Sequence, residues 1–179
     1  IVFITIIFIN TLMHRKFILA SSSKSRYKIL KNTGLNFIRK KPNCNEEDIK
    51  KTINRRTKPE IFAKKLSYEK AISVSRQKQY YNKIVLGCDT VIYHNGKILD
   101  KVNSIDKAKQ KIRSLSGKEH LIVSGLTICV NGSKVWENYE KTRVKIRNLN
   151  DSEINRYLKK TGKQILSSVG CYQIESLGP

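Results

Sequence analysis

The sequence predicts an α/β protein in which helices flank a mixed, twisted sheet. Short apolar runs typical of buried strands alternate with segments whose apolar residues recur at helical spacing. Two pairs, Asn95-Gly96 and Asn131-Gly132, each separate strand-like runs and predict hairpins, so part of the sheet must be antiparallel. A chain of 179 residues, 39% of them hydrophobic, is long enough to bury the core of one such domain.

The first half of the chain predicts strands and helices in alternation. An apolar run begins it, and the helix that follows ends near Gly34, a residue suited to a helix end. Pro59 suits the first turn of the longer helix that comes later. In order, we expect a strand over Phe17–Ala20, a helix over Ser25–Asn32, a strand over Leu35–Lys40, a loop or short helix over Lys41–Thr57, and a helix over Pro59–Arg76.

Capping residues and the two hairpins organise the second half. Ser104 precedes an apolar stripe and predicts the start of a helix that ends near Gly117. Asn150 with Glu153 resembles a capping box and predicts another helix start. The strands expected around these helices are Lys83–Leu86 continued by Val91–Tyr93, then Lys97–Leu99, Glu119–Val130, Ser133–Arg147 and Ser168–Ile174.

The two ends of the chain depart from this pattern. The chain does not begin with Met, and Met13 stands shortly before the first expected strand. We therefore expect residues 1–12 to be a non-native upstream extension and residues 13–179 to form a single domain. The apolar run Ile1–Ile9 is too short to span a membrane. Because the chain stops at Gly178-Pro179, directly after a strand-like segment, we expect its C-terminal end to be missing.

The composition is strongly basic. A net charge of +22 suggests an acidic partner such as nucleic acid, a nucleotide or a membrane surface. The basic residues are spread along the whole length, so much of this charge is expected on solvated faces. The cysteines form no C-x-x-C pair, which argues against a structural zinc site or a disulfide scaffold and favours the cytoplasm.

A candidate phosphate site follows the first expected strand. Ser21, Ser23 and Arg26 stand where a strand passes through a polar turn into a helix. The N–H groups at a helix start are unpaired and lie at the positive end of its dipole, and arginine offers a two-pronged cation. The same residues are also consistent with an ordinary strand–helix junction that has a serine cap.

Further polar residues lie where an α/β sheet places its ligands. Asp89 follows a buried run, where it suits a divalent cation or a general base, although an Asp that makes a turn is equally consistent. A hairpin would return Lys101 toward the same edge as a phosphate ligand. Lys101 and Lys70 are each also consistent with a solvated charge. Tyr172, Gln173 and Glu175 suit reading of a base edge, or form the polar face of a strand.

Together these segments resemble the Maf family of nucleoside triphosphate pyrophosphatases. Seven motifs occur in the family's order from Phe17 to Gly178, and that many in register make the likeness specific. They are S-x-S-x-x-R at Ser21–Arg26, L-A-x-x-K-A at Leu66–Ala71, G-[AS]-D-[TQ] at Gly87–Thr90, the hairpin with G-K-P at Asn95–Val102, L-S-G at Leu115–Gly117, [TS]-G-[VL] at Ser124–Leu126 and A-G-x-Y-x-I-[QE]-G-x-G at Gly170–Gly178.

The resemblance implies hydrolysis of modified or noncanonical nucleoside triphosphates to monophosphate and pyrophosphate, which limits their incorporation into nucleic acid. It also implies a divalent cation, usually Mg²⁺, a sheet that forms a cleft between two lobes, and commonly a homodimer without a stable nucleic-acid or membrane partner. The roles that it implies are base or metal-linked acid for Asp89, phosphate clamps for Arg26, Lys70 and Lys101, substrate-binding groups for Ser21, Ser23 and Glu175, and a second metal ligand for Glu46.

Departures from the family pattern narrow these expectations. Ser25-Arg26-Tyr27 keeps one arginine where many members have two, and Glu175 replaces Gln, as in the branch that acts on 7-methyl-GTP rather than on dTTP and UTP. Asp100-Lys101-Val102 replaces G-K-P, and the usual tail is absent. Two other hypotheses therefore stay open: a basic nucleic-acid-binding protein without catalysis, and an inactive Maf-like remnant or regulator of cell division.

Overall fold

The computed structural model describes residues 16–53 and 57–172, so the expected upstream extension and Glu175 lie outside the described residues. The chain divides into two compact units. The first contains the residues up to Asp89 together with Ser124–Tyr139, and the second contains Thr90–Val123 and the residues from Glu140 onward. Each unit is described by itself below.

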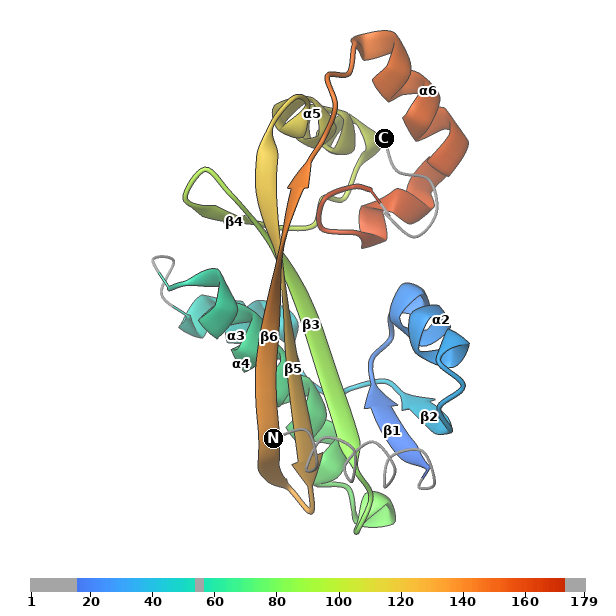
Figure 1. Cartoon of the computed structure of the whole chain (residues 1–179), viewed down its shortest axis with the longest axis vertical. Coiled ribbons are helices and arrows are strands. Elements are labelled where there is room, and N and C mark those ends of the chain that lie inside the picture. The colour runs from blue at the N-terminus through green and yellow to red at the C-terminus, as the bar shows by residue number, and fades with distance from the viewer. Residues whose placement is uncertain (1–15, 54–56, 173–179) are drawn as a thin grey trace. The chain divides into compact units, whose positions relative to one another are not determined.

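The strands form the mixed sheet that the sequence predicts (Figure 1). Their hydrogen-bonded order is β2-β1-β3-β5-β6, with β4 paired to β3. β1 pairs in parallel with both β2 and β3, whereas β3 and β4 are antiparallel across the first predicted hairpin. The strands are β1 Phe17–Ala20, β2 Phe37–Lys40, β3 Val85–His94, β4 Lys97–Leu99, β5 Glu119–Val130 and β6 Ser133–Lys145.

The helices lie close to their predicted positions. They are α2 Lys24–Asn32, α3 Glu46–Thr52, α4 Pro59–Ser75, α5 Ile105–Leu115 and α6 Asp151–Thr161, with 3₁₀ turns η1 Lys78–Tyr80 and η2 Gly162–Ser167. The capping signals act as predicted. The Ser104 hydroxyl accepts a hydrogen bond from the Lys107 N–H, and Asn150 and Glu153 form both bonds of a capping box. No helix in these described stretches is long and apolar enough to cross a bilayer.

The last predicted strand, Ser168–Ile174, is wrong over the part that the structure describes. Residues 168–172 form a turn after η2, in which the Cys171 N–H donates to the Ser168 carbonyl over 3.1 Å. Cys171 has φ +56°, a left-handed conformation that no extended strand contains. Residues 173 and 174 lie outside the described residues.

In the first unit, helix α4 packs directly against the sheet. A Cβ atom on Gly87 of β3 would lie 2.1 Å from the Ser67 carbonyl oxygen, and one on Gly125 of β5 would lie 2.4 Å from the Ala63 carbonyl oxygen. Only glycine permits this approach at both strands. The side chains of Ser67 and Thr127 also form a buried hydrogen bond of 2.7 Å between the helix and β5. These contacts fix the distance and register of α4 on the sheet.

The second unit has its own core between α5, α6 and η2. Ala108 and Ile112 of α5 pack with Ile154 and Leu158 of α6 and with Ile165 of η2. This is the apolar stripe that helical spacing predicts for both helices. The core holds together the connections that enter and leave α5.

Candidate active site

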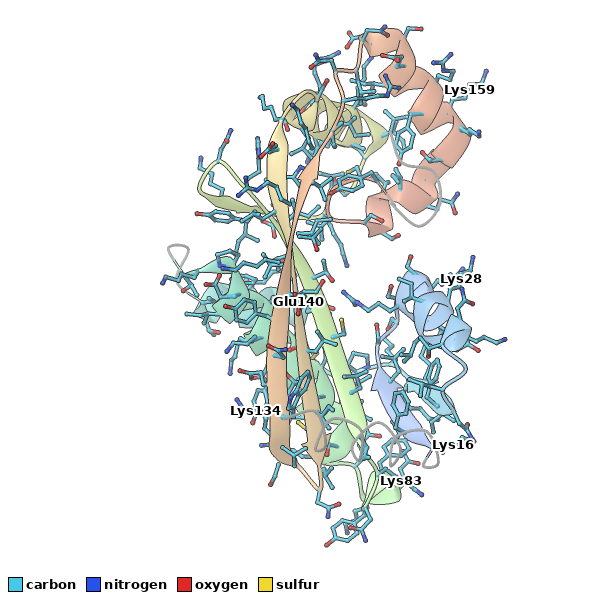
Figure 2. The ribbon with its side chains drawn as sticks, viewed as in Figure 1. Lys16, Lys28, Lys83, Lys134, Glu140 and Lys159 are labelled. Atoms are coloured by element: carbon cyan, nitrogen blue, oxygen red, sulfur yellow. The ribbon has the colours of Figure 1, made fainter. Side chains whose placement is uncertain are left out.

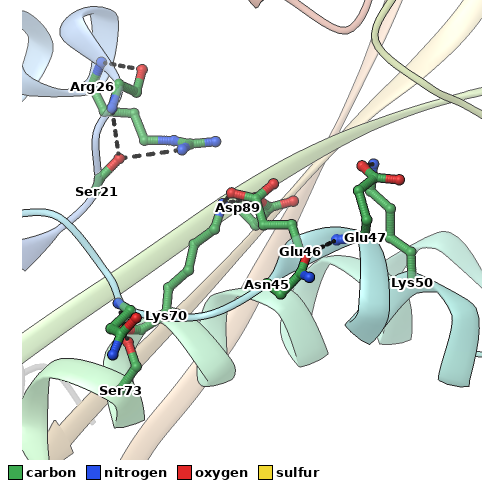
Figure 3. A network of polar contacts seen from close by, with 11 residues as sticks. Ser21, Arg26, Asn45, Glu46, Glu47, Lys50, Lys70, Ser73 and Asp89 are labelled. Carbon is green, nitrogen blue, oxygen red and sulfur yellow. Dashed lines mark hydrogen bonds and ion pairs between the residues drawn. The ribbon is translucent and has the colours of Figure 1, made fainter.

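A buried lysine with two carboxylate partners lies at the centre of the candidate site (Figure 3). Lys70 of α4 is 4% exposed, and its Nζ donates to Oδ1 of Asp89, which is 6% exposed. The same Nζ lies 2.9 Å from Oε1 of the half-buried Glu46. Ionised side chains are very rarely buried unless they are paired, so this trio is an arrangement that the fold must hold in place.

Glycine packing explains why Lys70 meets Asp89. Gly87 and Asp89 are two residues apart on β3 and so point to the same face of the sheet. On α4, Ser67 and Lys70 are separated by about one turn and share a helix face. Because Gly87 lets the backbone at Ser67 approach β3 closely, the Lys70 ammonium arrives beside the Asp89 carboxylate.

Helix α3 supplies the second carboxylate. Asn45 caps this short helix, and its side-chain oxygen accepts a hydrogen bond of 3.2 Å from the Glu47 N–H. Glu46, the first residue of α3, is directed toward Lys70, whereas Glu47 is exposed and pairs with Lys50 over 3.1 Å. The cap therefore determines which of the adjacent acids faces the buried lysine.

The polar turn after β1 lies on the same strand pair. Ala20 is opposite Gly87 in the parallel pairing of β1 with β3, so Ser21 leaves its strand beside the segment that leads to Asp89. The Ser21 hydroxyl, which is buried, accepts hydrogen bonds from the Ser23 N–H at 3.2 Å and from Arg26 Nη1 at 3.4 Å. The Ser23 hydroxyl caps α2 by accepting from the Arg26 N–H. The capped strand–helix junction is confirmed. The phosphate site at this turn stays a prediction.

Two thiols border the cluster, although the sequence patterns gave them no role. Burial raises the pKa of Cys88, and the nearby Arg26 guanidinium opposes that rise only partly. Burial also raises the pKa of Cys44, with Lys70 opposing it. A raised pKa keeps a thiol protonated, and the protonated form is neither a good nucleophile nor a metal ligand. In the sequence, the position of Cys88 next to Asp89 was the available indication that this thiol lies beside the cluster.

The structure thus brings together most of the predicted site residues. Six of them, all in the first unit, lie on neighbouring elements: Ser21, Ser23, Arg26, Glu46, Lys70 and Asp89. Lys101 is exposed in the second unit, between β4 and α5, so its role beside the others stays a prediction. Over residues 16–53 and 57–172, no group of three or more His, Cys, Asp and Glu side chains is arranged to hold a metal ion.

Comparison with known proteins identifies the family. The profile of the Maf family, described as Maf-like protein, matches residues 16–179, nearly the whole chain. The chain belongs to the Maf family. A "7-methyl-GTP pyrophosphatase" of Bartonella henselae is 36% identical over 161 residues, which cover 90% of this chain and 80% of that protein.

Other Maf-family relatives have different names. A "Nucleoside triphosphate pyrophosphatase" of Caulobacter vibrioides is 32% identical, with 89% of this chain and 79% of that protein covered. A "dTTP/UTP pyrophosphatase" of Thermosipho melanesiensis is 37% identical, with 90% and 81% covered. Sequence identity therefore does not separate the named substrate classes.

Proposed function

We propose that this Maf-family protein is a nucleoside triphosphate pyrophosphatase, which hydrolyses a nucleoside triphosphate to the monophosphate and pyrophosphate. The buried Lys70 between Asp89 and Glu46 is the observation that carries the proposal. An exposed lysine would be one of many solvated charges, but a cation held inside the fold by two acids suits an ionic substrate. The names of the relatives support the same reaction.

Each side chain of the cluster suits one part of this hydrolysis. Water attacks the α-phosphorus, and the Asp89 carboxylate orients it and accepts its proton. Lys70 contacts one oxygen of Asp89 and one of Glu46, which leaves a third donor on its ammonium for a phosphate oxygen. Arg26 clamps the phosphates from the other side, together with the α2 N-terminal N–H groups. The cations stabilise the charge that develops on the leaving pyrophosphate.

The carboxylates of this cluster also fit a divalent cation. Mg²⁺ in phosphoryl-transfer sites is commonly held by one or two carboxylates, with water and substrate phosphates as the remaining ligands. Asp89 and Glu46 both lie against the Lys70 ammonium, so they are close enough to share a cation in that way. When bound, the ion would neutralise phosphate charge and polarise the bond that breaks. We propose Mg²⁺ for this role.

The proposal extends to the base of the preferred nucleotide and to the role of the reaction in the cell. The single arginine in Ser25-Arg26-Tyr27 supports a modified guanine nucleotide such as 7-methyl-GTP. Removal of such nucleotides would limit their incorporation into nucleic acid. We propose in addition that the protein acts in the cytoplasm and forms a homodimer.

A screen of pyrophosphate release across canonical and methylated nucleoside triphosphates tests the proposal. We expect at least one of them to be hydrolysed, and Asp89→Asn to lower kcat about 10²–10⁴-fold because the water loses its base. Arg26→Ala should lower kcat about 10²–10³-fold, as expected for loss of one charge-stabilising donor. Asp48→Asn and Arg39→Ala are matched controls on exposed faces of α3 and β2 and should leave turnover unchanged. Absence of release from every nucleotide would refute the proposal.

A further inference from the structure

Lys111 of α5 makes contacts that no other lysine of this helix makes among the described residues. Its ammonium donates to the carbonyl oxygen of Asp100, and it donates to the carbonyl oxygen of Val169 over 3.0 Å. The two acceptors belong to segments far apart in the sequence, and neither segment is a helix or a strand. Asp100 immediately precedes Lys101, the proposed phosphate clamp of the second unit.

The two hydrogen bonds of Lys111 form a bridge between the Asp100 and Val169 carbonyls. On the Val169 side, the turn that accepts the bond is held by buried contacts. The turn that contains Val169 closes through the hydrogen bond from the Cys171 N–H to Ser168, and Cys171 is fully buried. The next residue, Tyr172, is also buried and forms a hydrogen bond with Nε2 of His120. A cation that donates to this turn is therefore attached to the core of the second unit.

The other acceptor, the Asp100 carbonyl, lies in the loop that carries Lys101. Residues 100–104 connect β4 to α5 without regular structure, and Lys101 is exposed. Val102, which stands where the resembling motif has a proline, packs at the edge of the core formed by α5 and α6. A proline would restrict its own φ and disfavour helical conformations of the residue before it, and valine does neither. The hydrogen bond from Lys111 to the Asp100 carbonyl is a restraint on this loop directly beside Lys101.

We propose that Lys111 is a positioning residue: by donating to the carbonyls of Asp100 and Val169, it fixes the loop that presents Lys101 to the substrate. The proposal rests on the pyrophosphatase function proposed above and on the phosphate-clamp role that the family resemblance implies for Lys101. Hydrogen bonds from a charged donor are stronger than those between neutral groups, so we expect loss of this bridge to release the loop. The substitution Lys111→Met would keep a side chain of similar length on α5, but methionine could donate to neither carbonyl.

The first test measures the loop and does not depend on activity. In the intact protein, the backbone order parameter of Lys101 from ¹⁵N relaxation should be near the rigid value of about 0.85, and Lys111→Met should lower it below about 0.6. Lys111→Arg, which can still donate to both carbonyls, should restore it. Lys107→Met changes an exposed lysine of the same helix and should have no effect. An unchanged order parameter in Lys111→Met would refute the tether.

The second test asks whether Lys111 acts through Lys101. Lys111→Met should lower kcat/KM about 10-fold when Lys101 is present, which corresponds to loss of about 1.4 kcal/mol of transition-state stabilisation. In a Lys101→Ala background it should lower kcat/KM less than about twofold, because the group that it positions is gone. Equal losses in both backgrounds would refute positioning and indicate a general structural role. A wild-type protein without activity would refute the proposed function, while the order parameter would still decide whether Lys111 holds the loop.

Discussion

At the scale of single residues, the decisive feature is Lys70. Residue type and local spacing alone do not distinguish it from the other lysines. The chain has 36 basic and 14 acidic residues, so Lys70 and Asp89 do not stand out by type. Their family motifs singled them out, and the structure shows what the motifs could not: both are buried, and Glu46 is a direct partner of Lys70. Burial depends on how α4 docks on the sheet, which local sequence does not encode.

Loss of Lys70 should cost stability as well as activity. Lys70→Met leaves the buried Asp89 carboxylate without its partner, and breaking a buried pair in this way costs about 3–5 kcal/mol. Lys65→Met is the matched control, because Lys65 forms a partly exposed pair with Glu69 on the same helix, and such pairs contribute about 0–1 kcal/mol. Urea unfolding measures both variants. Equal, small losses would show that the Lys70 pair is no more important than a surface pair.

At the scale of elements, local signals predicted nearly every helix and strand. Asn95-Gly96 and Asn131-Gly132 lie in the hairpins, and all four of these residues have positive φ. The strand prediction failed over residues 168–172, the described part of Ser168–Ile174, where strand-like residue types occur. There the chain turns at Cys171, and Tyr172 bonds to His120 from a distant strand. That partner lies far away in sequence, so no local pattern contains it.

The close packing of α4 on β3 gives an element-scale prediction. Gly87→Ala places a Cβ 2.1 Å from the Ser67 carbonyl oxygen, so the helix must move away from the strand. We expect a loss of about 1–3 kcal/mol in unfolding free energy, as for an overpacked core, and a larger relative loss of turnover because Lys70 moves with α4. Gly34→Asn is the control, since Gly34 has open space and Asn tolerates its φ of +76°. A fully active, equally stable Gly87→Ala protein would contradict this account of the site.

At the scale of the whole molecule, most of the charge lies on solvated faces. Figure 2 shows Lys28, Lys134 and Lys159 projecting from α2, β6 and α6, and Lys83 from the loop before β3, and all four are exposed. The large net charge was therefore a poor guide to function, as its even spread in the sequence suggested. Lys70 and Asp89 at the centre of the candidate site are buried, in contrast to these four lysines.

Buried titratable groups predict how the stability of the protein depends on pH. Burial, and then the neighbouring His94 ring, hold the pKa of His120 below its ordinary 6.5, so the unfolded chain binds a proton first as the pH falls. Stability should therefore fall below about pH 6.5. Burial raises the pKa of Cys129 from 9.0 to about 11, so stability should also fall above about pH 9, where the unfolded thiol ionises first.

Denaturant unfolding between about pH 5 and pH 10 measures both effects. His120→Gln should flatten the acid limb and Cys129→Ala the alkaline limb, whatever each costs at neutral pH. A slope that is the same in the variants and the wild-type protein would show that other groups control the pH dependence.

The reaction in H₂¹⁸O tests the central claim most directly. If the Lys70–Asp89 cluster directs water to the α-phosphorus, mass spectrometry will find ¹⁸O in the nucleoside monophosphate and none in the pyrophosphate, and Asp89→Asn will form both products about 10²–10⁴-fold more slowly. Label in the pyrophosphate, release of inorganic phosphate alone, or undiminished turnover by Asp89→Asn would contradict it.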